Sequence, residues 1–394
     1  MIKMKMKFLF GAAAAAITVF GVSSHSSASP ELNDISGHWA EASIKGAVSA
    51  GYVDGYEDKT FKPERNVSRA EFIKMAVNAL SLDIKTAADD NWYTPFANAA
   101  VDAGIHRTND FTSGDWNSPI TRLEMARIAV RATNPEFQKK EVTIDDRSVM
   151  YNGTKSGLIQ GLTKGDLAPD GQTTRAQSVT IIERIKKVKA GEKLEADKYA
   201  VGNAELGLIR TNIFTVMPEF FGGTQVAPSG VWDPSKLFVE TPDGKYRGEL
   251  DQLIAIDLED PNDPNLHLLP DIEKLKWNNL IPNGGFPVKD YKQSYILLYK
   301  GKTVFNKDTA IYAAKDYLPL SIFGIDLVDI EPYMKGQLNG PASVFENKQG
   351  DIPAYIIPKK GAKIKDYITL KISAPARAKN ENYSKTILTI FRGE

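Results

Sequence analysis

The feature that most constrains this chain is a short segment that occurs three times at one fixed interval. The copies are Val67-Ser68-Arg69-Ala70-Glu71, Ile120-Thr121-Arg122-Leu123-Glu124 and Thr173-Thr174-Arg175-Ala176-Gln177. Their arginines are 53 residues apart in both intervals, so no net insertion or deletion separates the copies. An internal period of this size indicates that one supersecondary unit occurs three times and that the units pack on one another.

Each copy has the pattern of a helix capping box, in which a Ser or Thr caps the helix and a Glu or Gln three residues later bonds back to the cap. The predicted pairs are Ser68 with Glu71, Thr121 with Glu124, and Thr174 with Gln177. Each arginine then stands at the first helical position, where the positive end of the helix dipole disfavours a cation unless an anion compensates.

Three such arginines in register indicate three anion sites, each made of a helix N-terminus and the guanidinium of Arg69, Arg122 or Arg175. For a single copy, the alternative is an ordinary capped helix without a ligand. The repetition favours ligand contact. The glutamates are expected to cap rather than bind, because a carboxylate would repel the proposed anion.

Each unit has the pattern of a helix, a glycine turn, a polar loop and a capped helix. Trp39 aligns with Trp92, and Gly51 aligns with Gly104 and Gly157 at the same shift. The first helix is expected over residues 39–50, with Gly51 as a left-handed stop. A helix pair of this size cannot bury its apolar side alone, so the three units should pack together.

The N-terminus has the pattern of a secretory signal over residues 1–28. Lys3, Lys5 and Lys7 precede an apolar run over residues 8–22 that is too short to span a bilayer comfortably. The whole chain has net charge 0, and loss of these three lysines leaves about −3. No strong basic balance remains, which argues against nucleic acid, or a membrane after signal cleavage, as the main partner.

Composition excludes several kinds of chemistry. The chain has no cysteine, so it has neither disulfides nor thiol catalysis. Its four histidines, His25, His38, His106 and His267, are too dispersed for a multi-histidine zinc site, and no common hydrolase or phosphate-binding motif occurs. We therefore expect no catalytic residue, no metal site and no cofactor.

The pattern changes after a charged stretch that ends in a predicted linker at residues 193–198. Residues 199–394 show strand-like alternation at Tyr295–Tyr299, Tyr367–Ser373 and Lys385–Phe391. Lys300-Gly301-Lys302 suggests a hairpin turn, and residues 312–317 suggest a short helix. These features predict a separate α+β or mostly-β domain.

The first unit resembles an S-layer homology (SLH) domain. The resemblance rests on Asp34-Ile35-Ser36-Gly37-His38-Trp39-Ala40, Gly51-Tyr52-Val53-Asp54-Gly55-Tyr56, Phe61-Lys62-Pro63 and Ser68-Arg69-Ala70-Glu71. The chain resembles a tandem of three such repeats, at residues 29–83, 84–137 and 138–192. The third repeat lacks the tryptophan and has Gln177 in place of glutamate.

The resemblance implies a multidomain protein whose all-α bundle contains three helix-pair repeats around a pseudo-threefold axis. In the family, grooves between the repeats hold a secondary cell-wall polysaccharide, commonly one with a pyruvate ketal. By position, the three arginines would bind its carboxylate. Trp39 and Trp92 would be groove walls, with core packing as the alternative, and Gly55 and Gly161 would allow the backbone to approach the sugar. Repeat two has Thr108 at that glycine position.

These features predict a non-enzymatic surface protein, secreted and held non-covalently in the cell wall or S-layer by the polysaccharide. Two alternatives remain open. The C-terminal domain could be an enzyme that acts on wall glycan, or the chain could be a structural S-layer subunit with S-layer neighbours. Nothing in the sequence identifies the partner of residues 199–394.

Overall fold

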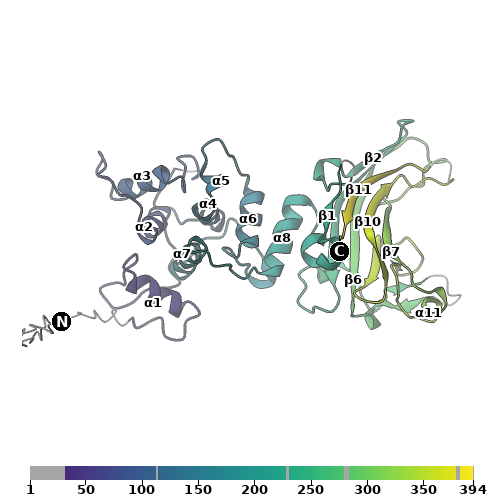
Figure 1. Ribbon diagram of the computed structural model, residues 1–394, viewed down its shortest axis with the longest axis horizontal. Coiled ribbons are helices and arrows are strands. Elements are labelled where there is room, and N and C mark those ends of the chain that lie inside the picture. The colour runs from purple at the N-terminus through teal and green to yellow at the C-terminus, as the bar shows by residue number, and fades with distance from the viewer. Residues whose placement is uncertain (1–31, 112–113, 228–229, 279–283, 379–381, 394) are drawn as a thin grey trace, which may run out of the picture.

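The computed structural model describes residues 32–111, 114–227, 230–278, 284–378 and 382–393. The predicted signal at residues 1–28 lies outside these ranges. Figure 1 shows a helical region at one end of the molecule and β-sheets at the other, with helix α8 between them. The chain is therefore multidomain, and its C-terminal region is mixed α+β, as the sequence predicts.

The helical region contains short helices separated by loops. They are α1 (Glu41–Ser49), α2 (Arg69–Ala79), α3 (Thr94–Asp102), α4 (Arg122–Thr133), α5 (Pro135–Gln138), α6 (Asp146–Lys155), η1 (Thr163–Gly165) and α7 (Arg175–Lys189). In each repeat the first helix is followed by a C-cap residue and then by a glycine. These glycines, Gly51, Gly104 and Gly157, have φ of +72°, +71° and +73°. These values are the left-handed conformation that favours glycine after a helix.

The repeats contact one another in a closed cycle. Helix α2 packs on α3, α4 on α6, and α7 returns to α1. The segments just before the caps make the same cycle through their backbones. Val67 N donates to Thr173 O at 2.9 Å, Thr173 N donates to Ile120 O at 3.0 Å, and Ile120 N donates to Val67 O at 2.9 Å. The last repeat is thereby bonded to the first.

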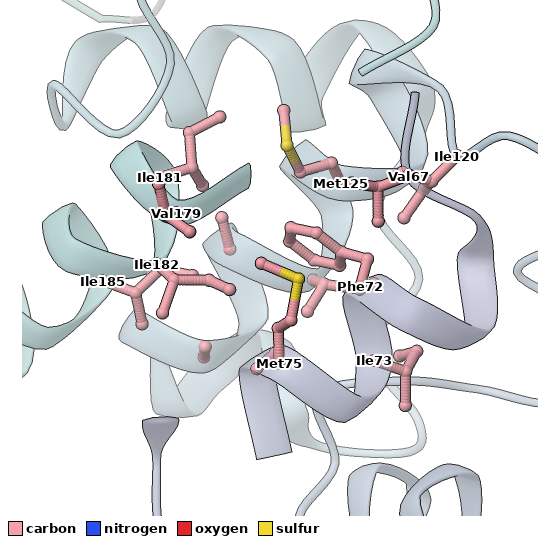
Figure 2. Packing of buried hydrophobic residues seen from close by; sticks show 14 of the residues in the cluster. Val67, Phe72, Ile73, Met75, Ile120, Met125, Val179, Ile181, Ile182 and Ile185 are labelled. Carbon is pink, nitrogen blue, oxygen red and sulfur yellow. The ribbon is translucent and has the colours of Figure 1, made fainter. Parts of the chain in front are cut away.

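One apolar core fills the space between these helices. Figure 2 shows Phe72 and Met75 from α2 beside Met125 from α4 and Ile182 from α7. Phe72, Met125 and Ile182 are fully buried. Burial of a side chain of this size contributes about 1.5–3 kcal/mol, and here each repeat supplies only part of the contact surface. The repeats therefore stabilise one another.

The C-terminal region begins with helices and continues as two antiparallel sheets. The helices are α8 (Lys198–Ile209), α9 (Ile213–Val216), α10 (Pro218–Phe221), η2 (Pro234–Lys236), η3 (Leu266–Leu268), η4 (Val288–Asp290) and α11 (Ile330–Met334). The strands are β1 (Thr224–Gln225), β2 (Phe238–Glu240), β3 (Tyr246–Asp257), β4 (Lys276–Trp277), β5 (Phe286–Pro287), β6 (Ser294–Asn306), β7 (Leu320–Asp326), β8 (Ala342–Phe345), β9 (Ala354–Pro358), β10 (Lys363–Ser373) and β11 (Ser384–Phe391).

The strand orders are β1-β11-β10-β7 in the smaller sheet and β2-β3-β6-β9-β8-β4-β5 in the larger one. The larger sheet is buried on both faces. Leu253 of β3 joins a core with Leu370 of the smaller sheet, whereas its neighbour Ile254 joins a second core with Trp277. Successive strand residues point to opposite faces, so one strand supplies both cores.

Two local predictions were wrong. Residues 300–302 do not form a hairpin turn, because β6 runs through them as one strand paired with β3. Gly301 lies at a register shift, where a Cβ would come within 2.5 Å of the Glu249 carbonyl oxygen. The glycine therefore permits close strand contact. Residues 312–317 contain no helix, and Tyr312 forms an isolated bridge with Ala376.

Helix α8 connects the two regions. Its N-cap is Asp197, within the segment predicted as a linker, and it packs against both α6 and α9. The helix ends at Ile209, and its C-cap is Arg210, a left-handed residue with φ of +67°. The Arg210 guanidinium donates to the carbonyls of Asp251, Leu250 and Pro234, which fastens the end of α8 to the C-terminal region.

Glu205 is a buried carboxyl group in α8, only 1% exposed. It accepts hydrogen bonds from Phe214 N at 3.1 Å and from the Thr215 hydroxyl. Burial raises the pKa of Glu205 from 4.5 to about 7, and the two hydrogen bonds only partly oppose this shift. The folded state therefore binds a proton that the unfolded chain releases above its ordinary pKa.

A raised carboxyl pKa gives stability that is present below pH 4.5 and is lost as pH rises through about 7. Between pH 5 and pH 8, we expect the wild type to lose roughly 1–3 kcal/mol more unfolding free energy than Glu205→Gln. Urea unfolding of both proteins at the two pH values measures it. The exposed Glu192→Gln is the control. Equal losses for wild type and Glu205→Gln would contradict the assignment.

Candidate functional site

The three predicted capping boxes are present at the starts of α2, α4 and α7. In α2, Ser68 Oγ accepts from Glu71 N at 3.2 Å, and the Glu71 carboxylate accepts from Ser68 N at 2.8 Å. The same reciprocal bonds join Thr121 with Glu124 and Thr174 with Gln177. Arg69, Arg122 and Arg175 are accordingly the first residues of their helices.

All three arginines are buried, with exposed fractions of 5–7%. Arg122 donates from Nε to Leu167 O at 2.9 Å and from Nη2 to Gln160 O at 2.8 Å. Both carbonyls belong to the loop of the third repeat. Arg122 therefore holds the loop of the next repeat against its own helix start.

Arg175 repeats this arrangement on the loop of the first repeat. Its Nε donates to Phe61 O and its Nη2 to Asp54 O, each at 2.8 Å. Phe61 and Asp54 stand 106 residues, or two repeats, before Leu167 and Gln160. The two arginines are thus equivalent in geometry as well as in sequence.

Arg69 differs from the other two. It donates from Nε and Nη2 to the two carboxylate oxygens of Glu124 at 3.1 and 2.5 Å, and from Nη1 to Asp115 O at 2.9 Å. Glu124 is itself buried. The charge of Arg69 is therefore balanced inside the protein.

Two grooves contain the predicted site residues. Groove A has a volume of about 280 Å³ and is lined by Trp39, Arg122, Ile159, Gln160, Gly161, Leu162, Gln177, Thr180, Ile181 and Arg184. Groove B has a volume of about 420 Å³ and is lined by Gly51, Tyr52, Val53, Asp54, Gly55, Tyr56, Glu71, Lys74, Met75, Asn78, Trp92 and Arg175.

The grooves are two copies of one site. All ten lining positions of groove A have a counterpart in groove B, 53 residues later for the tryptophan and arginine and 106 residues earlier for the others. Each groove takes its tryptophan from one repeat, its arginine from a second, and its loop and capped helix from a third. No repeat forms a groove alone.

A third position is equivalent to grooves A and B by the repeat interval, but it lacks both the tryptophan and the glycine. Asp145 replaces the tryptophan and Thr108 replaces the glycine. Its arginine is Arg69, and a second arginine, Arg131, donates to both oxygens of Asp110. Although burial opposes it, the adjacent His106 and the two hydrogen bonds from Arg131 hold the pKa of Asp110 well below its usual range. Both guanidinium groups at this position therefore have an internal carboxylate.

Groove A is the more positive of the two complete grooves. Its described lining contains Arg122 and Arg184 and no carboxylate. Burial lowers the pKa of both arginines, and for Arg184 the nearby charge of Arg122 lowers it further, although a guanidinium stays charged. In groove B, Arg175 and Lys74 are accompanied by Glu71 and Asp54 among the lining residues.

The tryptophans are exposed, which is unusual for this residue. Trp39 is 63% exposed and Trp92 is 50% exposed, and each lines its groove beside a cationic side chain. Lys74 Nζ lies 5.8 Å from the centre of the Trp92 ring. A flat aromatic surface beside a positive charge suits a ligand that is both apolar and anionic.

The two glycines permit close packing of the loops. A Cβ at Gly55 would lie 2.6 Å from Leu32 Cδ2, and one at Gly161 would lie 2.4 Å from Gly165 Cα. The protein itself fills the space that a side chain would need. Their predicted role in approach to a sugar stays a prediction.

Sequence reasoning missed the groove residues on the second helix of each pair. They are Thr180 and Arg184 on α7, and Lys74 and Asn78 on α2. Each lies three or seven residues after the capping Gln or Glu, which places it on the same helix face. Extending the helical period from the cap would have found them.

Other kinds of site are not evident in the part of the chain that the structure describes. There, no group of three or more His, Asp or Glu side chains is placed to hold a metal ion. No helix in the same ranges is long and apolar enough to cross a bilayer. A small cavity of about 70 Å³ lies beside α8, with Asp257, Asp260 and Asp263 in its lining.

The Arg69–Glu124 pair can be tested through stability. Arg69→Ala leaves a buried carboxylate without its partner, and we expect it to cost about 3–5 kcal/mol of unfolding free energy at pH 7. Arg122→Ala, whose partners are carbonyls, should cost about 1.5–3 kcal/mol. Urea denaturation measures both.

The double variant Arg69→Ala/Glu124→Gln supplies the control. Glutamine keeps the cap, as Gln177 does in α7, but carries no charge. The double variant should therefore recover more than about 1 kcal/mol of the loss. If it is no more stable than Arg69→Ala, the charge of Glu124 is not what makes Arg69 necessary.

Comparison with known proteins finds similarity in part of the chain. The family model for the S-layer homology domain matches residues 31–73. The chain is 34% identical over 171 residues to an amylopullulanase of Thermoanaerobacterium thermosulfurigenes, and 30% identical over 219 residues to a surface-layer 125 kDa protein of Lysinibacillus sphaericus. It is 42% identical over 50 residues to a cellulosome-anchoring protein of Acetivibrio thermocellus.

These matches cover 38%, 50% and 13% of this chain. They cover only 9%, 18% and 11% of the three relatives. The chain thus corresponds to a small part of each relative.

Proposed function

The chain carries an S-layer homology domain, and we propose that this domain anchors the protein non-covalently to the bacterial cell wall by binding a secondary cell-wall polysaccharide in grooves A and B. As an SLH-domain protein with S-layer relatives, it is secreted and associated with the cell wall. The proposal rests on one observation: grooves A and B each combine a tryptophan, an arginine, a loop and a capped helix in the same arrangement.

We assign the three repeats to residues 29–83, 84–137 and 138–192, as an all-α bundle around a pseudo-threefold axis. Support comes from the cyclic backbone bonds among Val67, Ile120 and Thr173. Because each groove combines three repeats, closure of this cycle is a condition for binding.

The ligand we propose carries a carboxylate, as a pyruvate ketal does. Arg122 and Arg175 each donate to loop carbonyls through Nε and Nη2, while Nη1 makes no hydrogen bond to the described residues. This nitrogen is the donor for the ligand carboxylate. The adjacent ring of Trp39 or Trp92 contacts the sugar face and the ketal methyl group.

Affinity in this proposal comes from two sites on one rigid domain. A polysaccharide presents its charged units repeatedly, so binding at one groove raises the effective concentration of the polymer at the other. The third position does not contribute, because carboxylates of the protein already occupy Arg69 and Arg131.

The proposal predicts two binding sites per chain. Calorimetric titration of the full chain with a methyl glycoside that bears a 4,6-pyruvate ketal should give a stoichiometry of two. Arg122→Ala or Arg175→Ala should each weaken one site by about 10- to 150-fold, the scale of a hydrogen bond to a charged group. A stoichiometry of three would show that the third position also binds the ligand, which contradicts the proposal.

The anchoring role is tested by co-sedimentation of the full chain with purified cell-wall sacculi. Binding should be lost when mild acid strips the attached polysaccharide, and also in Arg122→Ala/Arg175→Ala. The matched control is Arg147→Ala, which removes an exposed arginine of α6. Binding that survives stripping would show that the sacculus itself is the ligand.

An enzymatic role is the second candidate. Relatives named amylopullulanase and exoglucanase match this chain only in the SLH region, so they supply no catalytic residue for residues 199–394. The lattice alternative has no residue-level support either. Anchoring therefore remains the function that the geometry supports best.

A further inference from the structure

The start of the C-terminal region is bonded to groove A. Gly161, in the groove lining, donates its backbone N–H to Asp197 Oδ2 at 3.0 Å. The other oxygen, Oδ1, accepts from Tyr199 N at 2.9 Å and Ala200 N at 3.3 Å. One carboxylate thus caps α8 and holds the groove loop.

Close packing reinforces this bond. A Cβ at Gly165 would lie 2.5 Å from the Tyr199 carbonyl carbon, so loop and helix backbones are in direct contact. Asn203, one turn further along α8, donates to Lys164 O at 3.2 Å and Gly165 O at 2.9 Å. Gly165 in turn contacts Gly161. The loop therefore lies against α8 over residues 161–165.

The same end of α8 is fastened to the sheet region. The Tyr199 hydroxyl donates to Asp260 Oδ2 at 2.8 Å, and Lys198 Nζ contacts the same oxygen at 2.6 Å. Asp260 follows β3. A continuous set of hydrogen bonds thus joins the groove loop to the loop after β3.

Groove B is supported differently. The end of its loop is held by Asp34, whose carboxylate accepts from Phe61 N at 2.7 Å and Lys62 N at 2.8 Å. Leu32 packs against Gly55. Both supporting residues belong to the segment before α1. Groove A therefore receives its support from the C-terminal region, and groove B receives its support from the N-terminal segment.

We propose that Asp197 is a positioning residue for ligand binding in groove A, an inference that rests on the proposed function. The carboxylate fixes Gly161 N, and the preceding residue, Gln160, accepts the Nη2 bond of Arg122. Removal of the acceptor frees the loop to move relative to Arg122 and Trp39. The C-terminal region thereby completes groove A, and a chain ending at residue 192 lacks part of it.

The test uses Asp197→Asn in the full chain. Asparagine retains one oxygen to cap α8 but presents an amide in place of the second acceptor. The probe is the methyl glycoside with a 4,6-pyruvate ketal. Fluorine NMR of chains labelled with 5-fluorotryptophan reports the grooves separately, with Trp39 and Trp92 assigned through Trp39→Phe and Trp92→Phe.

We expect Asp197→Asn to raise the Kd read at Trp39 about tenfold and to leave the Kd at Trp92 unchanged. Amide hydrogen exchange at Gly161 should quicken in the same variant. The matched control is Asp329→Asn, which alters the cap of α11 and should change neither value. Asn203→Ala, a second variant, should weaken binding at Trp39 in the same direction.

The outcomes separate the two ideas. If the wild-type chain shows no ligand shift at either tryptophan, the proposed function is wrong, and the inference fails with it. If both grooves bind but Asp197→Asn matches wild type at Trp39, only the inference is overturned. Equal weakening at both tryptophans overturns it too, because the variant then acts on the whole domain.

Discussion

The closed cycle of backbone hydrogen bonds among Val67, Ile120 and Thr173 is the constraint on which the helical region depends. Each segment donates to one neighbour and accepts from the other, and each leads directly into a capped helix whose first residue is an arginine. The cycle therefore sets the distance from every arginine to the loop of the next repeat. Core packing and both grooves follow from that distance, since helices this short are not stable alone.

Local features of this region could be predicted from the sequence, because a capping box or a left-handed Gly51 depends on residues a few positions apart. The partners of Arg122 and Arg175 could not, since they belong to loops 38 and 121 residues away. The end of α8 could not be predicted from a glycine either. Its C-cap, Arg210, has the left-handed conformation without a glycine to mark it. In the sheets, Gly301 suggested a turn because its pairing with Leu250 of β3 depends on residues far away in the sequence.

Divergence among the repeats has produced three different positions from one pattern. Gln177 and Gln160 leave groove A without an acidic side chain, whereas their counterparts Glu71 and Asp54 reduce the positive charge of groove B. At the third position Glu124 forms a buried ion pair with Arg69. The same arginine can therefore serve a ligand or the fold. The outcome depends on whether the capping glutamate pairs with it, as Glu124 does with Arg69, or with another arginine, as Glu71 does with Arg65. The sequence motif occurs three times, but the charges support ligand binding at only two of the three positions.

The connection through α8 has a mechanical consequence. If the protein is held at grooves A and B and pulled through its sheet region, the hydrogen bonds between α8 and the groove A loop bear load alongside residues 190–197, which connect α7 to α8. Load passes from Asp260 through Tyr199 and Asp197 into the Gly161 loop, at the wall of the groove that bears it. Hydrogen bonds arranged in series along a load path yield at their weakest member. Detachment under shear would then begin where α8 meets groove A, and groove B would be left to hold the polymer.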